Sequence, residues 1–279
     1  MKRNFMKRLY KTLSIFATIS CVIWIISCPV LAHEFWIEPK KYKLNIGDVL
    51  SASLFVGQDF SGYENPYMKN NFSRFEVLYQ NESQKVNGRI GDRPALNLIP
   101  LHKGLSVILY QSSPTYLTYN DFQKFINFTE EKGFPEIPNQ HLSLNLPKKG
   151  FKETYTRFSK SFISVQNSSG KDRYSGMELE WVMEDTDLPY NISKNISFSL
   201  YYKGIPHPNS QVTIFSKNDA GKVKKSLART DKNGIFTLST VPNMSYLIDS
   251  VIIRKIEPTS NPEGAIWESL WASATLKSD

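Results

Sequence analysis

Short alternations of apolar and polar residues, separated by turn residues, restrict the fold of this chain more than any other feature. Between Phe35 and Tyr119 these runs are broken by turn-forming stretches such as Asn45–Asp48 and Asn87-Gly88. A period of two residues is typical of a β-strand with one buried face. The expected strands in this part of the chain cover residues 42–45, 49–56, 72–79, 96–99, 104–110 and 116–119. The pattern therefore predicts a mainly antiparallel β fold.

One helix is expected to interrupt the strands. Asp121 is a good helix cap, the apolar residues after it follow helical spacing, and Gly133 is a good stop, so a helix is predicted over about residues 121–131. Residues 134–152 contain several prolines and read as an ordered loop. Strands are expected at 156–165, where a helix is the alternative, and at 177–183.

A second β-rich unit follows an acidic, proline-containing stretch at 184–190 that reads as a linker. Its expected strands cover 196–202, 211–216, 225–230, 235–239, 246–255 and 266–276. The Asn-Gly pair at the end of Asp231–Gly234 predicts a hairpin between the third and fourth of these strands. We therefore expect two immunoglobulin-like or transthyretin-like antiparallel sandwich domains, residues 33–190 with one short helix and residues 191–279.

The first 32 residues have the pattern of a secretory signal peptide. Cations precede an apolar run at about Leu13–Ile26, and Pro29–Ala32 reads as the cleavage region. The apolar run is short for a stable membrane span. Cleavage after Ala32 would export the chain to the periplasm, not as an integral membrane protein, with His33 as its first residue. The alternative is a lipoprotein, because Ile25–Cys28 resembles a lipobox and lipidation of Cys28 would leave His33 without a free amine.

Composition excludes several function classes for a chain that begins at His33. Both cysteines, Cys21 and Cys28, lie in the signal, so the mature chain has neither disulfides nor thiolate ligands. Removal of the five signal cations, with no acids, lowers the formal charge from +8 to +3. No basic stripe with interleaved aromatic residues is left to suggest nucleic acid.

His33 is the strongest candidate for a metal ligand. A free N-terminal histidine offers its α-amine and its imidazole Nδ1, which together close a chelate ring, and imidazole suits nickel, cobalt, copper and zinc. Glu34 could add an oxygen donor, and His102 is the first candidate for a second imidazole because it belongs to the same expected domain. The alternative is that His33 is only the exposed start of the first strand. His141 and His207 are expected on the surface.

The other chemistry-bearing residues favour structural roles. Glu153, Arg157 and Lys160 are expected to form surface ion pairs, which contribute little. Trp267 and Trp271 share one strand face and predict core packing. The alternative is an exposed aromatic platform, which would fit a metal-free structural or adhesion-like module that binds protein or glycan. The sequence has no GxSxG, HExxH or phosphate-loop motif, so a non-enzymatic protein is expected. A histidine-brace copper enzyme would need a second histidine beside His33.

Several stretches agree in order and spacing with one protein family. They are residues 32–39 (AHEFWIEP), 116–117, 122–134 (FQKFINFTEEKGF), 153–157 with Lys160, 176–180, 202–206, 230–236 and 266–275. On these the chain resembles the domain of unknown function 4198 family, exported bacterial proteins described as periplasmic components of nickel or cobalt uptake. The chain departs from that family in its longer stretch at 181–189 and its few histidines. The resemblance implies a periplasmic accessory protein that handles nickel or cobalt, with copper or zinc as alternatives, for membrane metal-uptake machinery.

Overall fold

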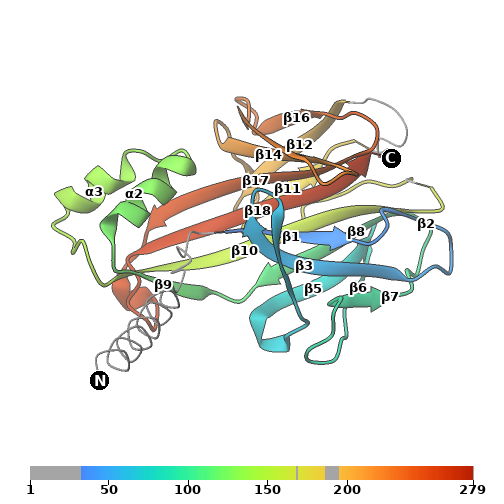
Figure 1. Ribbon diagram of the computed structural model, residues 1–279, viewed down its shortest axis with the longest axis horizontal. Coiled ribbons are helices and arrows are strands. Elements are labelled where there is room, and N and C mark those ends of the chain that lie inside the picture. Colours follow the sequence, from blue (N-terminus) through green and yellow to red (C-terminus); the bar gives the residue numbers. More distant parts are fainter. Residues whose placement is uncertain (1–32, 168, 186–194, 279) are drawn as a thin grey trace, which may run out of the picture. The chain divides into compact units, whose positions relative to one another are not determined.

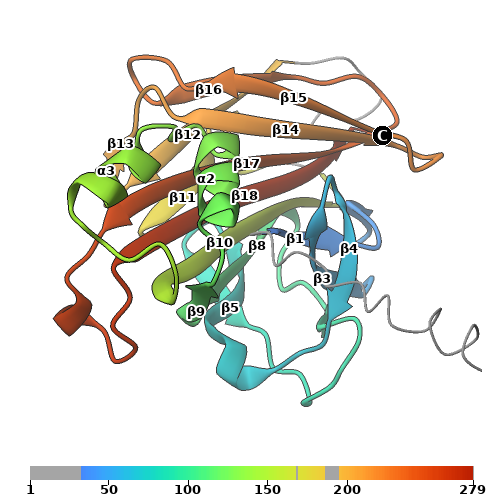
Figure 2. The same ribbon diagram turned by 60° about the vertical axis from the view of Figure 1, so that its left-hand side comes forward.

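The computed structural model describes residues 33–167, 169–185 and 195–278, and the expected signal peptide lies outside them. The described residues form a mainly β protein with three sheets and two short α-helices (Figures 1 and 2). Sheet A contains β1 (Glu34–Pro39), β3 (Leu50–Gln58), β4 (Ser61–Asn65) and β7 (Leu96–Leu98). Sheet C contains β11 (Leu179–Met183), β12 (Asn195–Tyr202), β13 (Ile205–Pro206) and β16 (Ile235–Ser239).

Sheet B is the largest, with ten strands. Its main order is β15 (Val223–Arg229), β14 (Gln211–Asn218), β17 (Met244–Lys255), β18 (Trp267–Ser278), β10 (Phe151–Val165), β8 (Gly104–Ser112), β5 (Phe72–Tyr79) and β6 (Glu82–Lys85). The short strands β2 (Lys43–Leu44) and β9 (Thr115–Tyr119) also pair with β10. The helices are α2 (Phe122–Glu131) and α3 (Ile137–Ser143), with short 3₁₀ turns η1 (Lys69–Asn71) and η2 (Pro258–Ser260).

Both faces of sheet B are covered along its long central strands. Alternate side chains of a strand point to opposite faces. On one face Phe158 and Leu270 pack in a cluster with Phe198 of sheet C. On the other face sheet A covers one part of the sheet, and α2 and α3 lie over the other part, against β18 and β17 (Figure 2). Charged residues in the covered part of β10 therefore face other layers of the fold on either side of the sheet.

The two expected domains share sheet B. β10, from the first half of the chain, pairs in parallel with β18, the last strand, from Glu153↔Trp267 to Ser161↔Thr275. The described residues belong to one compact unit. The expected boundary near residue 190 falls within residues 186–194, outside the described part, and stays a prediction.

The predicted helix is confirmed, and a second helix corrects the expected loop at 134–152. The Asp121 carboxylate caps α2 by accepting a hydrogen bond from the Gln123 amide at 2.9 Å. Gly133 ends α2 with φ +87, where a Cβ would also approach Gln211 Oε1 to 2.7 Å. Within the expected loop, α3 begins at Ile137 with Pro138 in its first turn. A proline is tolerated there because that backbone amide has no partner within the helix, so Pro138 did not signal a loop.

The predicted hairpin at Asp231–Gly234 is wrong, although the turn itself forms. The Asp231 carboxylate accepts hydrogen bonds from the amides of Asn233 and Ile235, both at 2.8 Å. The strands on either side belong to different sheets: β15 pairs with β14, whereas β16 pairs with β12. An Asn-Gly turn fixes a reversal of the chain, but the partner of each strand depends on the rest of the core.

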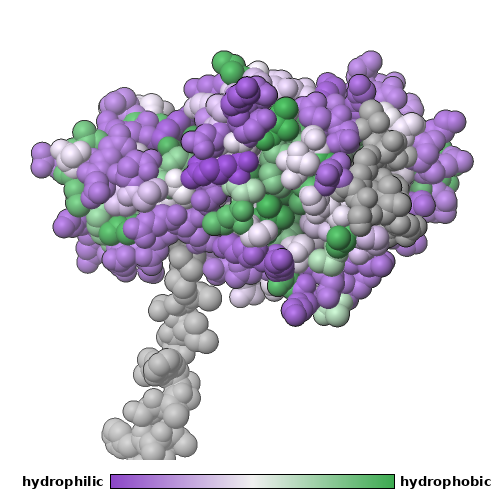
Figure 3. Space-filling model, turned by 90° about the horizontal axis from the view of Figure 1, so that it is seen from above, coloured by the Kyte–Doolittle hydropathy of each residue, from purple (hydrophilic) through white to green (hydrophobic). Residues whose placement is uncertain are grey.

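The surface is largely polar. Figure 3 shows hydrophilic side chains over most of one face and a smaller hydrophobic area near its middle. Large apolar side chains that are more than half exposed include Ile205 (69%) and Leu227 (60%). Among the described residues, no helix is both long and apolar enough to span a membrane.

Candidate functional site

The expected mature N-terminus lies at the start of β1, against the middle of the fold. β1 pairs with β3 from Glu34↔Gly57 to Pro39↔Ala52. It is also tied to sheet B, because the Thr275 hydroxyl donates to the Ile37 carbonyl at 2.7 Å. The Arg157 guanidinium donates through Nη2 to the His33 carbonyl at 3.1 Å. These contacts fix the backbone of His33 beside the central strands.

Next to His33, a buried cluster of charges joins three elements. Lys132, just after α2, places Nζ 3.0 Å from Glu34 Oε1 and 3.4 Å from Asp249 Oδ2 of β17. The three side chains are only 1–2% exposed. The same ammonium lies 4.6 Å from the centre of the Trp271 ring. This N-terminal charge cluster, Glu34, Lys132 and Asp249, connects the first strand to the helices and to the strands near the C-terminus.

Burial and mutual interaction set the ionisation of the cluster. Burial raises the pKa of Asp249 to about 6, with Glu34 adding to the effect and Lys132 opposing it. Burial disfavours the charged form of Lys132, but Asp249 and Glu34 outweigh it and raise the Lys132 pKa. The ammonium is therefore the fixed charge of the cluster, and the Asp249 carboxyl group is shifted toward its neutral form.

Four polar atoms around this region are buried without a hydrogen-bond partner among the described residues. They are His33 Nδ1, Glu34 Oε2, Arg157 Nε and Asp249 Oδ1. Buried polar groups in folded proteins are nearly always paired, so such a concentration marks a place suited to a bound group.

A pocket of about 380 Å³ adjoins the region and is lined by Arg157. Aromatic rings form much of its wall, including Phe35, Tyr110 and Tyr155. The Arg157 Cζ lies 4.8 Å from the centre of the Tyr155 ring and 6.0 Å from that of Phe35. Burial raises the pKa of Tyr110 to about 12 despite nearby Arg157, so this phenol stays neutral at physiological pH. The pocket thus combines apolar walls with one cationic group.

Three of the four charged residues of β10, Glu153, Arg157 and Lys160, correct the expectation of surface ion pairs. Lys160, on the face toward sheet C, lies 2.9 Å from Asp172 and 2.7 Å from Glu180, all at most 1% exposed. The Lys160 ammonium also donates to the Arg173 carbonyl, so this buried network is well satisfied and has a structural role. Arg157 is half-buried in the pocket described above. These side chains lie under other layers because both faces of the central part of β10 are covered, which local sequence does not reveal.

Glu153 is buried on the opposite face from Lys160 and has only hydroxyl partners in the described structure. It accepts hydrogen bonds from Tyr119 at 2.8 Å and from Ser269. Burial raises the pKa of Glu153 to about 7, although these hydrogen bonds oppose the shift. Burial raises the pKa of Tyr119, and the neighbouring Glu153 carboxylate adds to the rise.

The structure places the predicted metal-site residues as follows. His33 and Glu34 are adjacent, but Glu34 is engaged with Lys132 through one oxygen. His102 is half-exposed and lies 3.1 Å from Glu82. His102 lies just before the start of β8. His33 lies near the other end of this strand, where Ser112 accepts a hydrogen bond from the amide of Arg157, the residue that contacts His33. A strand of this length spans roughly 25 Å, so His102 and His33 are not brought together. Within the described ranges, no group of three His, Cys, Asp or Glu side chains could hold a metal ion.

The remaining histidines have surroundings of their own. His141, expected on the surface, is fully buried: its Nδ1 accepts from Trp267 at 3.0 Å, and its Nε2 lies 3.0 Å from the Pro147 carbonyl oxygen. Burial lowers the pKa of His141, so the neutral ring is favoured. The His207 ring packs against Tyr202 of sheet C. Neither supplies the second imidazole that a histidine brace at His33 would need.

The prediction of core packing for the tryptophan pair is confirmed. Trp267 is 1% exposed and Trp271 is 4% exposed, both under the helices. An exposed aromatic platform for protein or glycan does not form at these residues.

Sequence reasoning missed Lys132 and Asp249 as members of the site. Asp249 had a recognisable signal, since it is a lone acid inside the apolar run of 246–253. A charged residue at such a position requires a partner when the strand is buried. Lys132 carried no comparable signal, because a lysine at the end of a helix is ordinarily exposed to solvent and interacts favourably with the helix dipole.

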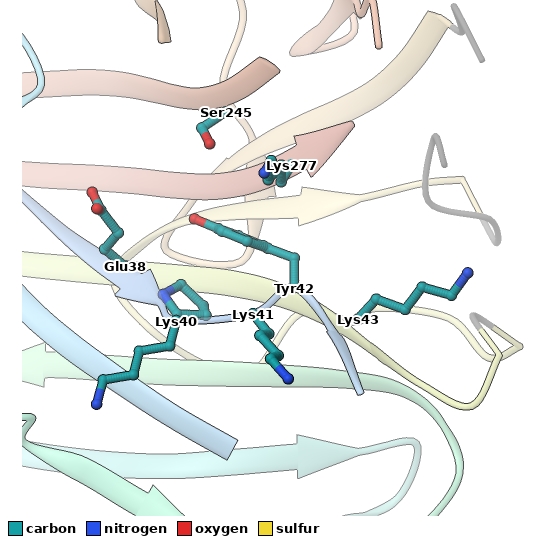
Figure 4. A pocket seen from close by; sticks show the side chains of 8 residues that line it. Glu38, Lys40, Lys41, Tyr42, Lys43, Ser245 and Lys277 are labelled. Carbon is teal, nitrogen blue, oxygen red and sulfur yellow. The ribbon is translucent and has the colours of Figure 1, made fainter. Parts of the chain in front are cut away.

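A second hollow, of about 360 Å³, opens beside the loop after β1. Figure 4 shows that Lys40, Lys41 and Lys43 direct their ammonium groups away from it in different directions. The Glu38 carboxylate on its rim is paired with Lys217 at 2.9 Å. The lysines of this hollow therefore do not converge on one ligand position.

Comparison with solved structures gives only remote similarity. A tetra-tandem repeat from the extending region of a large adhesion protein has a TM-score of 0.22 and 10% identity, over 89% of this chain and 50% of that one. The Yersinia pseudotuberculosis adhesin InvE has a TM-score of 0.22 and 11% identity, over 88% of this chain and 60% of that one. The D0-D1 domain of Intimin has a TM-score of 0.21 and 11% identity, over 87% of this chain and 97% of that one. The chain thus spans about half to three fifths of the first two proteins.

Comparison with curated proteins finds no match. One family model matches residues 30–253, which include β1, Lys132, Arg157 and Asp249. Because that match covers most of the chain, this protein belongs to the domain of unknown function family DUF4198.

Proposed function

We propose that this protein is a non-enzymatic, exported periplasmic protein that binds a divalent transition metal, nickel or cobalt, and passes it to membrane uptake machinery. The metal is the cargo, and copper and zinc are the alternative ions. The observation that carries the proposal is His33 Nδ1, which is buried and has no hydrogen-bond partner among the described residues. After cleavage at Ala32, the amine of the same residue would complete a two-nitrogen chelate.

The donor count favours transfer of the metal over storage. Tight protein metal sites have three or four protein ligands, whereas the chelate at His33 supplies two. Glu34 is held by Lys132 at 3.0 Å and is a poor third ligand. A metal held by His33 alone keeps open coordination positions that a receiving protein can use. The contact from Arg157 to the His33 carbonyl keeps the chelate in a defined place.

The test is nickel titration by calorimetry of the mature protein that begins at His33. A matched protein acetylated at the His33 amine keeps every side chain but converts the amine to an amide and supplies no new amine. We expect one nickel per mature protein and at least roughly tenfold weaker binding after acetylation, because a chelate ring is lost. His102→Ala should leave the affinity unchanged. Equal affinities for the mature and acetylated proteins would refute the chelate.

We also propose that residues 195–278 form an immunoglobulin-like or transthyretin-like sandwich. Support comes from their two layers, β12, β13 and β16 in sheet C and β14, β15, β17 and β18 in sheet B. One apolar cluster, including Phe198, Leu238 and Ile248, fills the space between the layers. By the same argument, sheet A and the strands β5, β6 and β8 of sheet B would form the two layers of a sandwich in the first half of the chain, around Val77 and Leu96.

A further inference from the structure

We infer that the pocket lined by Arg157 binds a small organic acid with a planar body, through a carboxylate on the guanidinium. This inference goes beyond the metal site and does not depend on it. The pocket volume of about 380 Å³ lies within the range of small-molecule sites. It is therefore large enough for a single-ring acid.

The charge of the pocket selects an anion. Arg157 is the one cationic residue among the described residues that line it, and none of them is acidic. The phenol of Tyr110 stays neutral because burial raises its pKa to about 12. The carboxylates Glu34 and Asp249 lie at Lys132 and are not in the lining. An anion in the pocket would thus meet an arginine without meeting a negative charge in the wall.

The hydrogen bonding of Arg157 leaves a donor for that anion. Nη2 donates to the His33 carbonyl, whereas Nε is buried and has no acceptor in the described structure. A guanidinium recognises a carboxylate through two parallel N–H groups, and Nε shares such an edge with Nη2, which carries two N–H groups and donates one of them to His33. The Tyr155 and Phe35 rings beside the guanidinium restrict its orientation.

The walls favour a flat ligand body. Phe35 and Phe72 both pack against Tyr110, with ring centres 4.7 Å and 5.7 Å from that of Tyr110. Offset or edge-to-face contacts with such rings favour an aromatic ligand. The amide side chains of Asn65, Asn70 and Asn71 also line the pocket and offer groups for a polar substituent. Benzoate is the simplest acid that combines a carboxylate with a flat ring.

The test compares benzoate with benzamide, which has nearly the same shape and no charge, using ligand-observed NMR on the mature protein without metal. We expect benzoate to bind roughly ten- to hundredfold more tightly than benzamide, as for a charged hydrogen-bonded pair. Arg157→Gln should abolish the preference, whereas Arg89→Gln, at an exposed arginine in another loop, should preserve it. Thermal melting establishes that each variant is folded.

A second variant guards against unfolding of the Arg157 variant. Val56→Phe adds volume at a half-buried wall position of β3 and should reduce benzoate binding at least tenfold while leaving Arg157 in place. Equal binding of benzoate and benzamide would overturn the inference. Unchanged benzoate binding in the folded Arg157→Gln or Val56→Phe variant would also overturn it. So would the absence of benzoate binding up to about 10 mM, a concentration well above that at which a specific pocket of this size fills.

Discussion

Replacing Lys132 with methionine tests whether the N-terminal charge cluster holds the fold together. Methionine keeps most of the aliphatic stem against Trp271 but removes the ammonium that lies 3.0 Å from Glu34 and 3.4 Å from Asp249. Breaking a buried ion pair leaves an uncompensated charge and costs about 3–5 kcal/mol. Because these side chains are 1–2% exposed, solvent does not screen the loss. We therefore expect Lys132→Met to lower the free energy of unfolding by about that amount at pH 8.

Lys225→Met is the matched control, because it breaks a pair of similar length at the surface. Lys225 Nζ lies 2.9 Å from Glu131, but each side chain is 35% exposed. Exposed pairs contribute about 0–1 kcal/mol, so the two lysine variants should differ by several kcal/mol. Urea unfolding followed by tryptophan fluorescence measures both, provided the slope of unfolding free energy against urea is unchanged.

The loss should also depend on pH in a defined direction. The pKa of Asp249 is raised to about 6, so this carboxyl is largely protonated in the folded protein at pH 5. Lys132→Met should then cost less at pH 5 than at pH 8, and adding Asp249→Asn should recover part of the stability at pH 8. A loss below about 1 kcal/mol at pH 8, or equal to that of Lys225→Met, would refute the reasoning.

Three further predictions test other parts of the fold. Burial raises the folded pKa of Glu153 to about 7, so the stability that its protonated form contributes is present below about pH 4.5 and is lost as pH rises through 7. Glu153→Gln should reduce this loss of unfolding free energy, which amounts to up to roughly 3 kcal/mol, when unfolding curves at pH 5 and pH 8 are compared. Gly133→Ala should destabilise by about 1–3 kcal/mol, because φ is +87 and the new Cβ meets Gln211, and a change under about 0.5 kcal/mol in urea unfolding would contradict this. N-terminal sequencing of the exported protein should begin at His33, and a lipid-modified start at Cys28 would remove the proposed chelate.

Local sequence predicted most of the strands, but not β4 or β6, and it predicted the first helix, because these signals lie within a few residues. The cap at Asp121 and the stop at Gly133 bound α2 as expected. The partners of the strands were not predictable in this way. The pairing of β10 with β18 joins residues more than a hundred positions apart, such as Glu153 and Trp267. No local pattern specifies such a contact, because it depends on the packing of the whole core.

The candidate site was predicted in part for the same reason. His33 and Glu34 were identified because a cleavage site and a metal-binding residue type coincide in the sequence. Arg157 was assigned to the surface because isolated charged residues usually lie there. Its burial follows partly from the neighbouring Tyr155 ring and partly from His33 at the start of β1, and the contact with His33 comes from a distant part of the chain.

The proposed export cleavage would change the charge of this region as well as its metal donors. In the folded chain, Glu34 and Asp249 balance Lys132 and Arg157, so a protonated amine at His33 adds one unbalanced positive charge. A carboxylate on Arg157 would restore the balance and favour the protonated amine. A metal ion needs the deprotonated amine instead, since ligands must lose their protons before binding. The proposed acid pocket and the proposed metal chelate would therefore place opposite demands on the same nitrogen atom, which would couple the two sites through charge even if their ligands never touch.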